Sequence, residues 1–139
     1  MTDQETILVR LDALKNYLHE LDHYAQYSFE DLKADFVKYR ATQHSLLLAA
    51  QAIVDIAMHI VAGDLGVAVE SYRQAVVELG NKGVIEVELA TRLAPFAGFR
   101  NILVHDYLVV DPAIVNDILM NGRSDMREFG RQIATYLQL

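Results

Sequence analysis

The residues best suited to chemistry lie within eight positions of one apolar helical segment, residues 100–107. At about 100° per residue, Arg100, Asn101, His105 and Tyr107 share one side of the expected helix. The opposite arc holds the apolar residues Pro95, Phe96, Phe99, Ile102 and Leu103. We therefore predict that one face of this helix packs on a core, while the other carries a guanidinium, an amide, an imidazole and a phenol.

These side chains suit the cleavage of RNA without a metal ion. Arginine is a permanent cation whose planar donors match phosphate, and histidine exchanges protons near neutral pH. A base would take the proton of a 2′-hydroxyl, which attacks the adjacent phosphorus while a cation holds the developing charge and an acid protonates the departing oxygen. One chain supplies one histidine on this face, so we expect a symmetric dimer that apposes two such faces.

A structural role for the same residues stays open. Arg100 and His105 near a helix C-terminus also complement the helix dipole and bind its last carbonyls. From the residues alone, Tyr107 fits a half-buried aromatic side chain better than a reactive group. No glycine-rich phosphate loop, zinc motif or Ser–His–Asp set accompanies them, so this face is the main candidate site.

Two other pairs have the i,i+4 spacing that brings side chains together on a helix. We interpret His19 and His23 as solvent-exposed, because a metal site would need a third ligand. Asp55 and His59 fit a hydrogen-bonded pair under a loop or at a subunit contact, with a catalytic or ligand role as the alternative.

Composition limits the class of protein. The 139 residues predict a single domain, 1–139, with no disulfides because cysteine is absent. A hydrophobic fraction of 53% favours an oligomer, and the net charge of −7 argues against a broad nonspecific nucleic-acid surface. No secretory signal or membrane span is expected, since polar residues interrupt the apolar stretch 46–62. We expect a cytoplasmic protein without a membrane partner.

The apolar periods are helical throughout, so we predict an all-α fold: an antiparallel bundle of four to six helices. The helix 29–62 is apolar nearly all round in its middle and is expected to be central and buried. Gly98 is expected to allow close helix packing. The remaining helices are expected at residues 3–24, 71–79, 86–107, 112–120 and 125–137. Their expected boundary residues are Thr2, Ser28, Ser71 and Asp111 as N-caps and Gly63, Gly66 and Gly80 as stops.

The segment Phe99-Arg100-Asn101-Ile102-Leu103-Val104-His105-Asp106-Tyr107 resembles the R-x4-H-x-Y signature of HEPN domains. More narrowly, it resembles the HepT toxins of HepT–MntA toxin–antitoxin pairs. The lead-in 93–99, the exit 109–112 and the pattern at 55–60 are similar to that family as well. The resemblance covers nearly the whole chain.

The resemblance implies a homodimeric, HEPN-like ribonuclease that needs no metal or cofactor. Arg100 and His105 would be catalytic, and Asn101 would position the histidine or a phosphate. A cognate MntA-like nucleotidyltransferase antitoxin would transfer AMP to Tyr107, placing negative charge beside Arg100. RNA is the implied substrate, with messenger and transfer RNA both open.

The chain departs from the family pattern at one place. Gln43-His44 stand where many relatives carry an acidic–basic pair, which leaves Arg40 and His44 without an assigned role. Two alternatives also remain: a non-catalytic HEPN subunit that partners a minimal nucleotidyltransferase, and a plain dimeric helical bundle.

Overall fold

Helices form wherever apolar residues recur at helical spacing. The structure, a computed structural model, describes residues 3–105 and 111–139, without the side chains of residues 102–105. The elements are α1 (Gln4–Tyr24), α2 (Phe29–Ala34), α3 (Phe36–Ile60), the π-helical turn η1 (Val61–Leu65), α4 (Tyr72–Asn81), α5 (Val87–His105), α6 (Pro112–Asn121) and α7 (Arg123–Tyr136). No strand occurs among the described residues, and the all-α prediction is confirmed.

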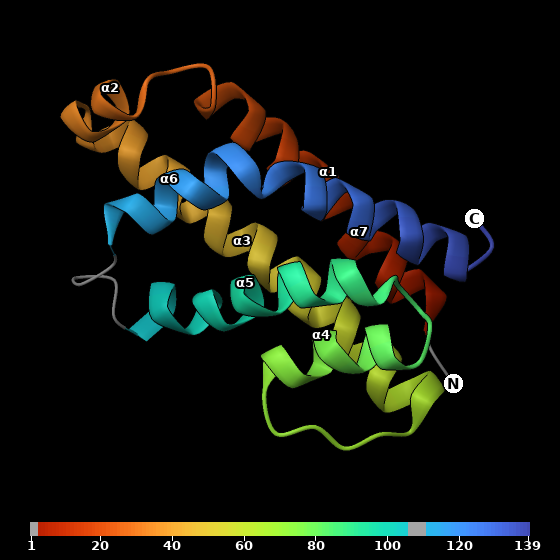
Figure 1. Ribbon diagram of the computed structural model, residues 1–139. Coiled ribbons are helices and arrows are strands. Elements are labelled where there is room, and N and C mark those ends of the chain that lie inside the picture. Colours follow the sequence, from red (N-terminus) through yellow and green to blue (C-terminus); the bar gives the residue numbers. More distant parts are fainter. Residues whose placement is uncertain (1–2, 106–110) are drawn as a thin grey trace.

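The central element is α3, which crosses the middle of the bundle. It packs against α1 on one side and against α4 and α5 on the other, while α7 lies along α1 (Figure 1). Its buried residues include Ala49, Ala50, Ile53 and Ala57, each fully inaccessible to solvent. The prediction of a central, buried helix is therefore confirmed for this segment.

The stretch Phe36–Leu65, which is α3 with η1, is long and apolar enough to cross a membrane. The polar residues that interrupt the stretch 46–62 therefore do not exclude a span by length and composition, contrary to the argument from the sequence. More than half of its most apolar part is buried against the other helices. Its apolar character is therefore explained by the core that it forms within the bundle.

The expected helix 29–62 is not continuous, which is why the described chain has seven α-helices rather than at most six. Asp35 adopts an extended conformation and ends α2. Its Oδ1 accepts hydrogen bonds from the backbone N–H groups of Val37 (3.1 Å) and Lys38 (3.2 Å), the first turn of α3. An aspartate that caps a new helix in this way breaks the old one.

Most helices begin at the N-cap residues predicted from the sequence. Side-chain caps are confirmed at Ser28, Ser71 and Asp111. At α1 the cap is Asp3, whose Oδ1 accepts from the N–H groups of Glu5 and Thr6, and not the expected Thr2, which lies outside the described residues. Asp3 is one residue closer to the helix and offers a carboxylate to the same first-turn donors.

The glycines predicted to end helices or to allow close packing have different roles in the structure. Gly66 ends η1 with a φ of 61°, as expected of a helix stop. Gly80 does not end α4, which continues to Asn81; a Cβ at Gly80 would lie 2.6 Å from the Cβ of Ala90 on α5. At Gly98 a Cβ would meet no atom of the described residues within 4 Å. Among the described residues, close helix packing is therefore found at Gly80 and not at Gly98, where it was predicted.

Candidate active site

Arg100 lies near the end of α5, on the side away from its buried arc. Phe96 and Phe99 are 6% and 4% exposed, as the helical pattern predicts, although Pro95 of the same arc is exposed. Arg100 is half-buried and Asn101 is exposed. The helix therefore anchors the arginine through its apolar face and leaves Arg100 and Asn101 at least partly accessible to solvent.

The guanidinium of Arg100 has contacts with three helices. Its Nε donates to Oε1 of Gln51 on α3 at 2.7 Å, and its Nη1 donates to Oδ1 of Asn101 at 3.1 Å. Its Cζ lies 5.2 Å from the ring centre of Tyr72, the first residue of α4. The cation is thus held at an edge by an amide and over a face by an aromatic ring.

The contacts continue beyond Gln51 to a second arginine. Nε2 of Gln51 donates to Oδ1 of Asp55 at 2.7 Å, and Oδ2 of Asp55 pairs with Nε of Arg10 on α1 at 3.4 Å. The carboxylate of Asp55 is therefore engaged by these two residues and not by His59, the partner expected from spacing. His59 is exposed and borders a shallow pocket beside Asp55.

Gln51 and Tyr72 were not identified as site residues from the sequence. Gln51 had one usable signal, because it is a polar residue inside an otherwise apolar, buried helix. Tyr72 had none, since its contact with Arg100 arises only when α4 folds back onto α5.

The other predicted site residues lie at the edge of the described chain. His105 is the last residue of α5, and its side chain is outside the described part. Tyr107 lies wholly outside the described residues. In a regular helix, residues five apart differ by roughly 140° in direction and about 7.5 Å along the axis.

Among the described residues, no hydrogen bond or ring contact joins the other histidines to Arg100. His19 and His23 are exposed, as predicted, and the ring of His23 lies edge-on to Tyr24 and Tyr27. Arg40 and His44 are exposed on the first half of α3. The described residues contain no group of three or more His, Cys, Asp or Glu side chains placed to hold a metal ion.

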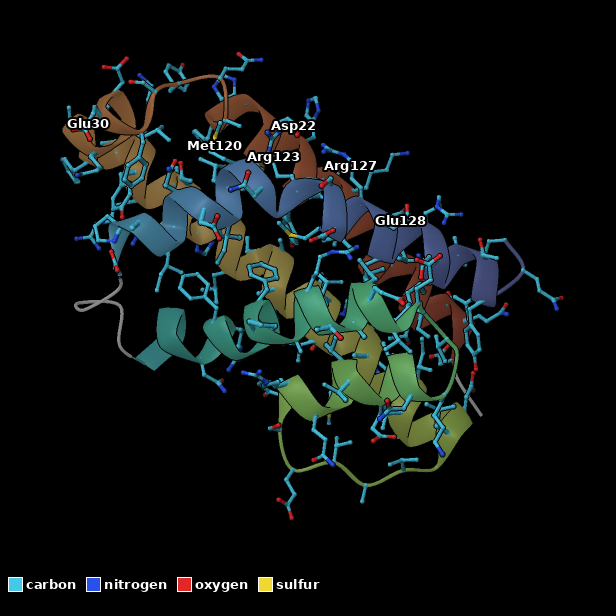
Figure 2. All side chains as sticks on the ribbon, viewed as in Figure 1. Asp22, Glu30, Met120, Arg123, Arg127 and Glu128 are labelled. Atoms are coloured by element: carbon cyan, nitrogen blue, oxygen red, sulfur yellow. The ribbon has the colours of Figure 1, made fainter. Side chains whose placement is uncertain are left out.

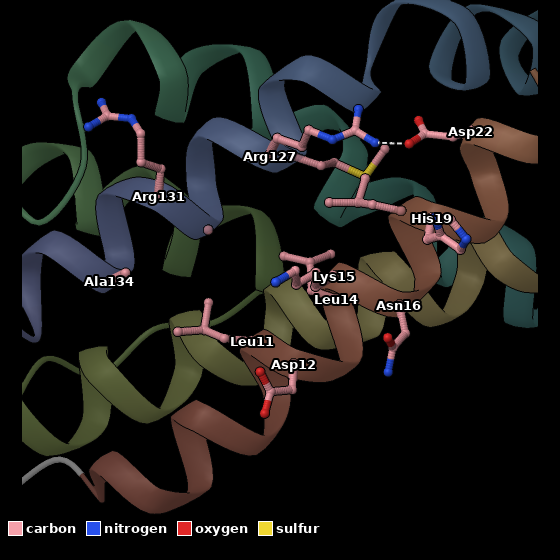
Figure 3. A pocket seen from close by; sticks show the side chains of 13 residues that line it. Leu11, Asp12, Leu14, Lys15, Asn16, His19, Asp22, Arg127, Arg131 and Ala134 are labelled. Carbon is pink, nitrogen blue, oxygen red and sulfur yellow. Dashed lines mark hydrogen bonds and ion pairs between the residues drawn. The ribbon is translucent and has the colours of Figure 1, made fainter. Parts of the chain in front are cut away.

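A hollow of about 570 Å³ lies between α1 and α7 (Figure 3). Asp22 of α1 accepts from Arg123 (2.7 Å) and pairs with Arg127, and these three side chains converge between the two helices (Figure 2). The hydrogen bond from Arg127 is the main cause that lowers the pKa of Asp22. Because Asp22, Arg127 and Arg131 in its lining are already paired and Arg100 does not line it, we interpret this hollow as part of the α1–α7 contact.

Comparison with known proteins points to one family. Residues 14–133 match the family described as Ribonuclease HepT-like. The chain is 32% identical to the tRNA nuclease HepT of Aphanizomenon flos-aquae over 139 residues, covering 99% of this chain and 95% of that protein.

Two solved structures share the fold. A tri-AMPylated Shewanella oneidensis HEPN toxin in complex with MNT antitoxin has a TM-score of 0.84 and 24% identity, with 97% of this chain and 99% of that chain covered. The cytosolic protein of unknown function YutE from Bacillus subtilis has a TM-score of 0.86 and 20% identity, with 99% and 92% covered.

Proposed function

Because this chain belongs to the ribonuclease HepT-like family, we propose that it is the toxin of a toxin–antitoxin pair and a metal-independent endoribonuclease. The observation that carries the proposal is the Arg100 guanidinium, which three helices hold at the start of an R-x4-H-x-Y motif. A cation fixed in this way is suited to a phosphate whose charge increases during reaction.

In the proposed reaction His105 acts as the proton-transfer group. A histidine removes the proton from a 2′-hydroxyl, the 2′-oxygen forms a bond to the adjacent phosphorus, and the bond to the 5′-oxygen breaks. The leaving 5′-oxygen takes a proton from an acid, which leaves a cyclic phosphate and a 5′-hydroxyl. Arg100 stabilises the extra negative charge on the phosphorane oxygens, and Asn101 orients the groups around it.

We propose that the working unit is a homodimer. One chain offers a single motif histidine, whereas the proposed reaction needs both a base and an acid. A two-fold contact between motif faces brings a second histidine and a second arginine into one cleft. One histidine then serves as the base and the other as the acid.

Tyr107 is the proposed point of control. A cognate nucleotidyltransferase of the MntA type would transfer AMP from ATP to the Tyr107 hydroxyl, releasing pyrophosphate. Support comes from the matched fold of an AMPylated HEPN toxin in complex with MNT antitoxin. The added phosphate carries negative charge next to the motif cation and competes with RNA for it.

We propose transfer RNA as the first substrate to examine, supported by the name of the relative at 32% identity. The reaction partners are then RNA and the antitoxin, and the expected compartment is the cytoplasm. Neither a cofactor nor a metal ion is required by the proton transfers above.

Expression in a bacterial host that lacks the antitoxin tests this proposal. We expect wild type to arrest growth, His105→Ala to be harmless at equal expression, and co-expression of the nucleotidyltransferase to restore growth. Harmless wild type with an unmodified intact mass would contradict the toxin proposal and favour a non-catalytic subunit. An intact mass raised by AMP would instead identify protein that was already neutralised, and the Tyr107→Phe variant then repeats the test.

A further inference from the structure

We propose that Gln51 and Asp55 are positioning residues that hold Arg100 in a fixed orientation without cancelling its charge. The inference rests on the proposed function, in which Arg100 binds the scissile phosphate. It concerns two residues of α3 that lie 49 and 45 positions before Arg100 in the chain. Neither belongs to the R-x4-H-x-Y motif.

The first step is the number of donors that remain on the guanidinium. An arginine has five N–H donors in a planar fork. The Nε–H is given to Gln51 and one Nη1–H to Asn101. Among the described residues, the hydrogen bonds of Arg100 therefore leave three donors at the Nη end for a phosphate. Because the Nε–H is already donated to Gln51, a phosphate is expected to bind through the Nη groups and not through the side formed by Nε and Nη2.

The second step is the orientation of the Gln51 amide. Its oxygen accepts from Arg100 and its nitrogen donates to Asp55 at the same distance, 2.7 Å. If the amide were flipped, a donor would face the Nε–H of Arg100 and an acceptor would face the Asp55 carboxylate. Both contacts would then be repulsive. Asp55 therefore fixes the amide in the one orientation that accepts from Arg100.

The third step concerns charge. A carboxylate in direct contact with Arg100 would bind it more strongly but would compete with the phosphate for the same cation. The neutral Gln51 lies between them, and the negative charge of Asp55 is paired instead with Arg10 at 3.4 Å. The arrangement orients the cation and leaves its charge for the substrate.

The sharpest test exchanges the two groups. The variant Gln51→Glu/Asp55→Asn keeps the charge of the pair and a hydrogen bond between its members, but it moves the carboxylate onto Arg100. We expect kcat for RNA cleavage to fall roughly ten- to a hundredfold, with KM changed less because remote contacts with RNA persist. Gln51→Leu, which removes both hydrogen bonds, should lower kcat similarly.

Asp125→Asn is the matched control. Asp125 is 25% exposed and pairs with Arg92 at 3.0 Å, while Asp55 is 26% exposed and pairs with Arg10. The Asp125 pair joins α7 to α5, and the Asp55 pair joins α3 to α1. Only the Asp55 pair is linked to Arg100, through Gln51. The control should retain wild-type kcat, and unfolding by urea should show similar small effects for Asp125→Asn and the exchanged variant.

A second readout does not depend on RNA cleavage. The NMR signal of the Arg100 Nε–H reports directly whether the group is held. We expect an ordered Nε–H in wild type and a mobile one in Gln51→Leu. Wild-type kcat in both Gln51 variants, or an Arg100 Nε–H equally ordered in Gln51→Leu, would overturn the inference. If wild type itself cleaves no RNA, the proposed function fails, and the Nε–H signal still decides the positioning role.

Discussion

The guanidinium carbon of Arg100 lies 5.2 Å from the centre of the Tyr72 ring, which joins the end of α5 to the start of α4. A planar guanidinium stacks on an aromatic face in a way that a lysine ammonium does not reproduce. Together with the hydrogen bond to Gln51, this contact depends on the shape of arginine as well as on its charge.

Arg100→Lys should therefore lose most activity although the charge is kept. We expect kcat/KM for RNA to fall by about two orders of magnitude, the usual cost of removing an oriented group that stabilises charge. Initial rates on transfer RNA give the measurement. Arg92→Lys, two turns earlier on the same helix, is the control and should be unchanged; equal losses in both would indicate a general effect of the substitution.

Tyr107→Phe should remain an active toxin but escape the antitoxin. The variant lacks the hydroxyl that accepts AMP, while Arg100 and His105 are untouched. Mass spectrometry after incubation with ATP and the nucleotidyltransferase is the measurement: wild type should gain AMP, and the variant should not. AMP found on another residue of wild type would refute the assignment of Tyr107.

Much of the fold follows from the sequence because burial and helix capping are local in origin. Ile7, Leu14, Leu18 and Leu21 recur at helical spacing and are all buried in α1. The sequence did not predict the break between α2 and α3 at Asp35, because an aspartate can occupy either a position inside a helix or an N-cap. Only its extended backbone, with φ −107° and ψ 97°, distinguishes the two.

The site was predicted less completely than the fold. The motif places Arg100 and Asn101 on one helix, and their contact in the structure agrees with that placement. The contacts of Gln51 and Tyr72 with Arg100 could not be predicted, because they arise only through the packing of α3 and α4 on α5, although Gln51 stands out as a polar residue in an apolar helix. Residues that are distant along the chain have no periodic signal relative to each other.

Gly80→Ala should destabilise the protein. The new Cβ would lie 2.6 Å from that of Ala90 and 3.4 Å from the backbone of Val87, so α4 and α5 must separate. We expect a loss of about 1–3 kcal/mol in the free energy of unfolding. The new Cβ of Gly130→Ala on α7 meets no atom of the described residues within 4 Å. This variant should be more stable by about 0.5–1 kcal/mol through helix propensity. Urea unfolding of both variants gives the comparison, and equal effects would contradict the packing argument.

Tyr136 should make stability depend on alkaline pH. Burial and the hydrogen bond that its hydroxyl donates to Asp64 (2.7 Å) raise the pKa of Tyr136 to about 12 from 10.0. The unfolded chain therefore loses this proton first, and the stabilisation, complete below pH 10, should be lost as the pH rises from 10 to 12. Urea unfolding of wild type beside Tyr136→Phe measures it; a constant difference across that range would contradict the prediction.

The central claim is that His105 and Arg100 cut RNA without a metal ion. The most direct measurement is cleavage of transfer RNA by purified, unmodified wild type and His105→Ala, side by side in EDTA, with circular dichroism to verify that both are folded. We predict cleavage by wild type at a rate that EDTA does not change, and none by the variant. Cleavage by His105→Ala at the wild-type rate, or a wild-type reaction that EDTA stops, would contradict the account.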